Sequence, residues 1–142
     1  MNNRQAYFNY HIEDKYAAGI VLMGTEVKSI REGKVSFADS YCLFDKGELW
    51  VRGLNIAEYS HGTAYNHTPV HDRKLLLTSR ELKRLEAKMK EKGFTIIPLK
   101  IFFNEKNLVK LEIGLARGKK VHDKRESIKE RETQREMKRY LK

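Results

Sequence analysis

Cysteine is nearly absent from this sequence, and long hydrophobic runs are missing altogether. The single thiol, Cys42, excludes an internal disulfide and a cysteine-based zinc cluster. It lies in an apolar stretch, so we expect a buried and unreactive side chain. No apolar run reaches the roughly 20 residues that span a bilayer, and none follows the first five residues. We therefore expect a soluble, cytoplasmic protein without a secretory signal or a membrane partner.

Sequence patterns of common enzymes are also missing. The chain contains no GxSxG motif, no Walker loop and no GxGxxG motif. His61, His67 and His71 lie in one stretch near Asp72, but their spacing matches no familiar zinc-binding pattern. An ordinary polar loop is the favoured interpretation, and an RNA-processing hydrolase that uses these histidines is the alternative. We expect no enzymatic activity, no cofactor and no metal.

Acidic residues are too few to balance the basic ones. The chain carries 29 Lys and Arg against 19 Asp and Glu, a net charge of +10, which favours a polyanionic partner such as nucleic acid. Residues 1–116 contain 18 basic and 14 acidic side chains, whereas residues 117–142 contain 11 and 5, with only five apolar side chains. This split predicts a folded body, 1–116, and a basic tail, 117–142. The tail is expected to be disordered when free and helical along a polyanion; a solvated helix without a partner is the alternative.

Alternation of apolar and polar residues predicts a mainly β body. The expected strands cover residues 7–13, 18–23, 35–44, 48–56, 96–103 and 108–116. Asp45-Lys46-Gly47 is typical of a hairpin turn. Two helices are expected, one over 25–32 with Thr25 as N-cap, the other after a capping box from Thr78 to Glu81. This order predicts a small, closed or partly open antiparallel barrel with a helix inserted before the last hairpin.

Basic residues gather at several places along the chain, next to apolar and aromatic ones. Arg73 and Lys74 precede Leu75-Leu76-Leu77, an apolar strand. The other basic groups are Lys28, Arg31 and Lys34; Arg117, Lys119 and Lys120; and Arg4 beside Tyr7, Phe8 and Tyr10. Cations that bind phosphates and rings that stack on unpaired bases favour RNA as the partner.

Several colinear blocks give the chain a resemblance that is more specific than any of these patterns. The blocks are Asn3-Arg4-Gln5-Ala6, Ala18-Gly19-Ile20, Gly24 to Arg31, Arg73 to Leu77, Pro98-Leu99, Gly114 to Lys120 and Asp123-Lys124-Arg125. In these the sequence closely resembles the SsrA-binding protein family of bacterial trans-translation. The resemblance implies an oligonucleotide-binding barrel with flanking helices and no catalytic activity. It also implies an adaptor that binds the tRNA-like domain of tmRNA and delivers it to stalled ribosomes, where the nascent peptide is tagged.

The resemblance also implies partners and a set of site residues. Partners would be tmRNA, the small-subunit decoding site and message channel of the ribosome and, through the RNA, elongation factor Tu. Together with the basic groups above, the expected RNA-binding residues are Asn3, Arg4, Lys28, Arg31, Lys34, Arg73, Lys74, Leu76, Lys110, Gly118, Lys119 and Lys120. The expected ribosome-binding residues of the tail, helical on the ribosome, are Asp123, Lys124, Arg125, Ile128, Lys129 and Arg131.

The chain departs from the family pattern at three positions. Ala17 stands where the family commonly has Glu, Phe8 where it often has His, and Thr133 where it often has an aromatic residue. The residues alone also leave open a second interpretation, a general rRNA-binding module such as a ribosomal protein or a translation factor. Such a protein would bind many structured RNAs about equally.

Overall fold

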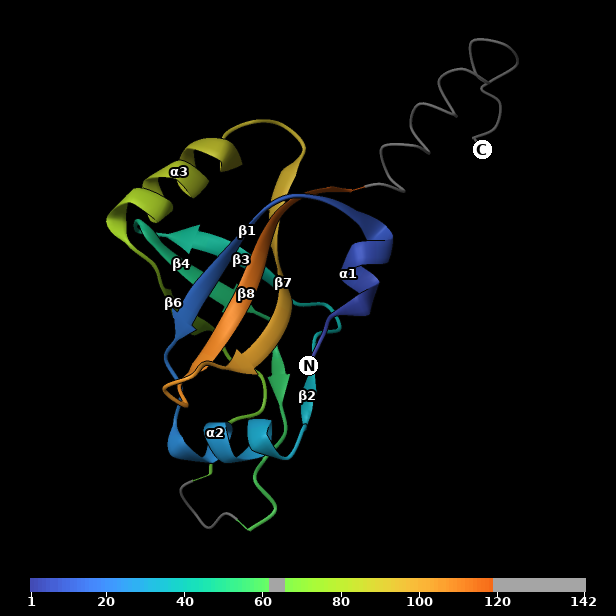
Figure 1. Cartoon of the computed structure of the whole chain (residues 1–142), viewed down its shortest axis with the longest axis vertical. Helices are drawn as coiled ribbons and strands as arrows, with labels where there is room; N and C mark the ends of the chain where they lie inside the picture. The colour runs from blue at the N-terminus through green and yellow to red at the C-terminus, as the bar shows by residue number, and fades with distance from the viewer. Residues whose placement is uncertain (62–65, 119–142) are drawn as a thin grey trace, which may run out of the picture.

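Six antiparallel strands form a closed barrel in the computed structural model, which describes residues 1–61 and 66–118 (Figure 1). The elements in chain order are α1 (Arg4–Asn9), β1 (Tyr10–Ile20), α2 (Gly24–Arg31), β2 (Val35–Ser36), β3 (Tyr41–Asp45), β4 (Glu48–Arg52), β5 (Asn55–Ile56), β6 (Arg73–Leu76), α3 (Ser79–Met89), β7 (Phe94–Phe103) and β8 (Val109–Gly118). The barrel order is β1-β6-β4-β3-β7-β8, and β2 pairs with β5 in a separate two-stranded sheet. The predicted mainly β barrel is confirmed.

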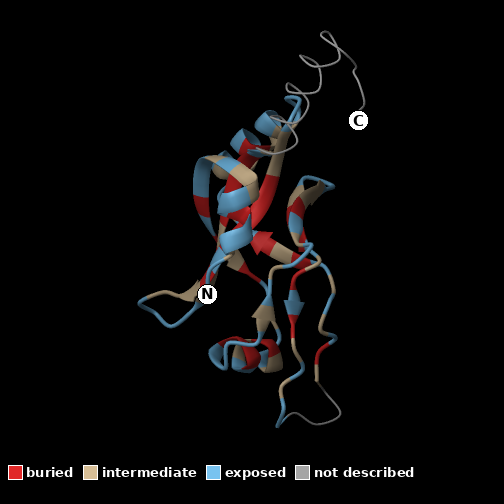
Figure 2. Ribbon diagram, turned by 90° about the vertical axis from the view of Figure 1, so that its right-hand side faces the viewer, coloured by how far each residue is buried: buried red, intermediate tan, exposed pale blue. Residues whose placement is uncertain are grey.

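Strand alternation fills the barrel with aliphatic side chains. Leu49 and Val51 of β4 and Leu111 and Ile113 of β8 are fully buried, as expected for every second residue of a strand with one face inward. A smaller apolar cluster outside the barrel contains Ala6, Ile97, Leu99 and Ala116, and α1 contacts β1 and β7. Figure 2 shows the buried residues concentrated mainly along the strands.

Two local motifs formed as the sequence predicts. In the β3–β4 hairpin, Asp45 pairs with Glu48, and both Lys46 and Gly47 have positive φ, the backbone conformation of a two-residue turn. At the start of α3, Thr78 Oγ1 accepts a hydrogen bond from the Glu81 amide, and Glu81 Oε1 accepts one from the Thr78 amide.

The N-terminal third of the chain differs from the prediction. Residues 7–9, expected in a strand, form the end of α1, and the strands expected over 10–13 and 18–23 are parts of one long strand, β1. Within α1, Ala6 is the buried residue, and it belongs to the cluster with Ile97, Leu99 and Ala116. Thr25 is not the N-cap of α2, since the helix begins at Gly24 and Glu26 Oε1 accepts the Met23 amide, 2.9 Å away.

Each arm of the predicted 35–56 hairpin is divided in two. Residues 37–40 separate β2 from β3, and Gly53-Leu54 separates β4 from β5. Gly53 has a φ of +81°, and a Cβ there would clash with the carbonyl oxygen of Asp39. A glycine is therefore required where the two bends contact each other.

The boundary expected after residue 116 lies inside β8. Arg117 pairs with His11 and Phe94, and Gly118 pairs with Tyr10, so the barrel continues at least to Gly118. Residues 119–142, which include most of the predicted tail, lie outside the described residues. Within the described part of the chain, no helix is both long and apolar enough to cross a membrane.

Candidate RNA-binding surface

One outward-facing row of residues crosses four neighbouring strands of the barrel. Phe102 of β7 pairs with Lys110 of β8, Lys110 with Gly19 of β1, and Gly19 with Leu76 of β6. Leu76 is 51% exposed although it is a large apolar residue. Gly19 has no side chain, and a Cβ there would lie 3.2 Å from the Leu76 Cβ. The row therefore offers an exposed apolar side chain beside a cation with only backbone between them.

Lys74 lies on the same face, two residues before Leu76. It pairs with Trp50 of β4, and its Nζ is 2.7 Å from Oε2 of Glu48. Val21, also 51% exposed, follows β1, and its backbone N–H donates a hydrogen bond to the Lys74 carbonyl. An exposed ion pair of this kind contributes little stability, so the Lys74 ammonium can exchange Glu48 for a phosphate at small cost.

Helix α2, whose sequence contains Lys28 and Arg31, lies at the same end of the barrel, next to the β7–β8 turn (Figure 1). The Arg31 guanidinium is 5.2 Å from the ring centre of Phe103, the last residue of β7. The Lys28 ammonium is 5.5 Å from the ring centre of Tyr59. Lys34, after the helix, forms an ion pair with Glu32 at 3.3 Å. The structure thus brings Lys28, Arg31, Lys110 and Leu76, which are far apart in sequence, to one end of the barrel.

A buried ion pair fixes α2 in this position. Glu26 of α2 and Arg73 of β6 are 0% and 1% exposed, and Arg73 Nε is 2.6 Å from Glu26 Oε2. Arg73 also donates hydrogen bonds to the carbonyls of Leu54, Pro69 and His71. The prediction that Arg73 contacts RNA is therefore wrong, because its guanidinium points into the protein and its hydrogen-bonding groups have partners there.

The charge state of Glu26 follows from its contacts. Burial alone would raise the pKa of Glu26, but the Met23 amide, the Arg73 guanidinium and the His71 imidazole outweigh it and lower the pKa from its ordinary value of 4.5. Glu26 is consequently an anion at neutral pH, and it holds α2 to β6 and to the segment after residue 66.

The histidines of the predicted loop have separate structural partners. His67 is buried, with Nδ1 2.8 Å from Thr25 Oγ1 and Nε2 2.8 Å from the Ile56 carbonyl. His71 Nε2 lies 2.9 Å from Glu26 Oε2, and His61 packs edge-on against Tyr59. Among residues 1–61 and 66–118, no group of three His, Cys, Asp or Glu side chains is placed to hold a metal ion. His61, His67 and His71 therefore do not form the shared site that the hydrolase alternative requires.

Cys42 is 2% exposed, and burial raises the pKa of its thiol far above the usual range. The expected burial is confirmed, and a thiol that stays protonated is a poor nucleophile.

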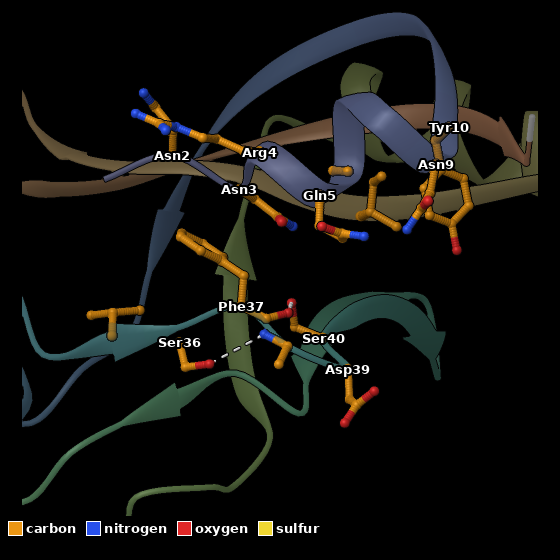
Figure 3. A pocket seen from close by; sticks show the side chains of 14 residues that line it. Asn2, Asn3, Arg4, Gln5, Asn9, Tyr10, Ser36, Phe37, Asp39 and Ser40 are labelled. Carbon is orange, nitrogen blue, oxygen red and sulfur yellow. Dashed lines mark hydrogen bonds between the residues drawn. The ribbon is translucent and has the colours of Figure 1, made fainter.

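Asn3 and Arg4 lie elsewhere, where the N-terminal segment crosses the barrel. Asn3 Nδ2 donates to the Pro98 carbonyl at 2.8 Å, and the Asn3 amide donates to Leu99 at 2.7 Å. These bonds attach the segment to β7, so the Asn3 amide group has a structural partner. Arg4 is exposed and lines an open groove of about 750 Å³ (Figure 3).

The junction with the predicted tail lies at the opposite end of β8 from Lys110. Eight residues of strand, about 26 Å, separate Lys110 from Gly118. Arg117, beside Gly118, is 4.3 Å from the ring centre of Phe94 and 3.4 Å from Glu13 Oε2. Lys119, Lys120, Asp123, Lys124, Arg125, Ile128, Lys129 and Arg131 lie outside the described residues.

Sequence reasoning overlooked several residues of these surfaces. Val21 and Phe102 belong to the exposed face beside Lys74 and Lys110, and Gln5, Asn9 and Phe37 line the groove. The alternation of β1 and β7 could have indicated the first two, because residues two apart on a strand share a face. Nothing in the sequence pairs residues 5 and 9 with residue 37.

Comparisons with known proteins agree with one another. The family model described as SmpB protein matches residues 1–142. A protein of Bacteroides thetaiotaomicron named SsrA-binding protein is 54% identical over all of this chain and 95% of its own length. One of the same name from Fervidobacterium nodosum is 53% identical over 99% of this chain and 94% of its own length. A solved structure described as "tmRNA-SmpB: a journey to the center of the bacterial ribosome" is 50% identical, with a TM-score of 0.72 over 84% of this chain and 83% of the other.

Proposed function

The chain belongs to the SmpB protein family, and on this premise we propose that it is an RNA-binding adaptor for tmRNA. It binds the tRNA-like domain of tmRNA and delivers this RNA to stalled ribosomes, where trans-translation rescues the ribosome and tags the nascent peptide. Its partners are tmRNA and the ribosome, at the small-subunit decoding site and the message channel, with elongation factor Tu contacted through the RNA. It acts in the cytoplasm by binding alone, without catalysis.

The observation that carries this proposal is the gathering of cations and an exposed leucine at one end of the barrel. Lys28, Arg31 and Lys110 come from α2 and β8, and Leu76 lies beside Lys110 across Gly19. Lysine and arginine bind phosphates, and an exposed aliphatic side chain covers the apolar face of a ribose or an unpaired base. Lys34 and Lys74 add positive charge to this surface. Arg73 instead holds α2 in place through its buried ion pair with Glu26.

For the tail, the support is its charge. Residues 117–142 carry a net +6 with few apolar side chains, which suits a segment that lies along ribosomal RNA. We assign Lys119 and Lys120 to the RNA-binding junction. Residues Asp123, Lys124, Arg125, Ile128, Lys129 and Arg131 are assigned to the ribosome, where the tail enters the message channel as a helix.

The test is a titration against the isolated tRNA-like domain at several salt concentrations, with bulk tRNA and an unrelated hairpin as competitors. Full-length protein and a variant ending at Gly118 are compared. We expect both to prefer the tRNA-like domain at every salt concentration, and only the full chain to support tagging on stalled ribosomes. Equal binding to all three RNAs would instead indicate a general rRNA-binding module. In that case the logarithm of the binding constant should fall with the logarithm of the salt concentration, with a slope of about −0.7 to −0.9 per phosphate contact.

A further inference from the structure

The open groove lies outside the cation-rich end of the barrel. One wall is the N-terminal segment with α1, and the other is the 37–40 bend between β2 and β3 (Figure 3). Its volume of about 750 Å³ is within the range of small-ligand sites. The lining combines amides, hydroxyls and two aromatic rings, Phe37 of the bend and Tyr10 at the start of β1, a mixture suited to a flat, polar-edged ligand.

The α1 wall presents two amide groups. Gln5 and Asn9 are four residues apart, so they lie on one face of the short helix, and Figure 3 shows both side chains on its underside, facing the bend. Neither amide group makes a hydrogen bond in the part of the chain that the structure describes. Each can donate and accept, as the edge of a nucleobase requires.

The facing wall holds an aromatic ring in a fixed position. Figure 3 shows the Phe37 ring rising from the bend toward Asn3, and Phe37 is partly buried against the barrel core. The bend is braced because Ser40 Oγ donates to the Phe37 carbonyl and Gly53 contacts Asp39. A ring fixed before binding loses little entropy when a base stacks on it.

Charge at the rim favours an anionic ligand. Arg4 lines the groove, is exposed, and makes no ion pair in the part of the chain that the structure describes. Asp39 is the acidic residue of the lining, and Figure 3 shows its carboxylate pointing away from α1. Figure 3 shows the Arg4 side chain extending away from the bend at one end of the groove, so a phosphate at this rim meets a cation and no facing carboxylate.

We propose that this groove binds one unpaired nucleotide of RNA. Its base stacks on Phe37, its polar edge bonds to Gln5 and Asn9, and its phosphate contacts Arg4. A paired base cannot occupy the groove, because its edge is already hydrogen-bonded within the duplex. The inference rests on the proposed function and adds a second contact, which reads an exposed base, to the cationic surface formed by α2, β8 and β6.

The test uses the full chain and the tRNA-like domain of tmRNA, with 2-aminopurine placed in turn at each unpaired position. We expect one position to lose fluorescence when the wild-type protein binds, and this quenching to disappear with Phe37→Leu, which keeps an apolar side chain against the core. The double variant Gln5→Ala/Asn9→Ala should bind about tenfold more weakly with an unchanged salt slope, since it loses base contacts and no charge. Arg4→Gln removes one phosphate contact, so the slope of log binding constant against log salt concentration should become shallower by about 0.7 to 0.9. The charge-matched control Arg80→Gln on α3 should leave this slope unchanged.

An abasic nucleotide at the quenched position completes the design. It should weaken binding of the wild type more than binding of Phe37→Leu, because Phe37→Leu has already lost the stacking contact and only the hydrogen bonds to Gln5 and Asn9 remain to be lost. Affinity and quenching like those of the wild type in the groove variants would overturn this inference while the preference for the tRNA-like domain stands. Loss of that preference in the wild-type protein would instead refute the proposed function.

Discussion

Arg73 and Lys74 are neighbours on β6, and the structure predicts opposite consequences when each is changed to methionine. Both follow the same basic-apolar pattern in the sequence, but Arg73 points into the protein and Lys74 points outward. Methionine is a suitable replacement because its unbranched side chain fills most of the space and removes only charge and hydrogen bonds.

For Arg73→Met, the expected loss is large. Glu26 would stay buried without its cationic partner, and removing one member of a buried ion pair costs about 3–5 kcal/mol. The carbonyls of Leu54 and Pro69 would lose their donor as well. Against a total stability of about 5–15 kcal/mol for a small domain, this is a substantial fraction.

For Lys74→Met, the expected change in stability is small. The ion pair with Glu48 is exposed, with 38% and 47% of the two side chains accessible, and such pairs contribute about 0–1 kcal/mol. Lys74→Met should instead weaken RNA binding. If Lys74 contacts a phosphate, the slope of log binding constant against log salt concentration becomes shallower by about 0.7 to 0.9.

Urea unfolding followed by circular dichroism, together with RNA titration of each folded variant, measures both effects. The double variant Arg73→Met/Glu26→Gln is the control, and it should recover part of the stability because no buried charge is left unpaired. An unfolding midpoint of Arg73→Met equal to that of the wild type would refute the argument from burial. So would a greater loss of stability in Lys74→Met than in Arg73→Met.

Two further results are expected. Because the folded-state pKa of Glu26 lies below its ordinary value of 4.5, the unfolded chain takes up the proton first as the pH falls. The stability that Glu26 contributes is complete above pH 4.5 and is lost as the pH drops through the folded pKa, so the urea midpoint should fall more steeply there in the wild type than in Glu26→Gln. Gly53→Ala should lower the unfolding free energy by about 1–3 kcal/mol, because it combines a positive φ with a clash against the Asp39 carbonyl. Gly24→Ala, where an added Cβ has nothing within 4 Å, is the matched control and should unfold like the wild type in the same urea titration.

The features that were predictable from sequence depend on neighbours in the chain. The Lys46-Gly47 turn and the Thr78–Glu81 capping box each involve a few consecutive residues whose side chains and backbone decide the local conformation. The buried residues of β4 and β8 were predictable for a similar reason, since alternation along a strand assigns a whole face at once.

The features that the sequence did not reveal depend on distant partners. Residues 7–9 alternate like a strand but form helix, and the buried residue of that helix, Ala6, packs in a cluster with Ile97 and Ala116, about 90 and 110 residues later. The unequal roles of Arg73 and Lys74 depend on Glu26, 47 residues before Arg73, whose carboxylate gives a buried guanidinium its partner.

The sequence by itself thus determined the basic character of the protein, its mainly β barrel, the local turns and caps, and the resemblance to its family. Charge, alternation and motif are all properties of a linear chain. Only the tertiary structure decided which cations face solvent, that Lys110, Gly19 and Leu76 form one row, and that Gln5 and Asn9 face Phe37 across a groove. Those arrangements arise from strand register and from packing between distant segments, which no local pattern encodes.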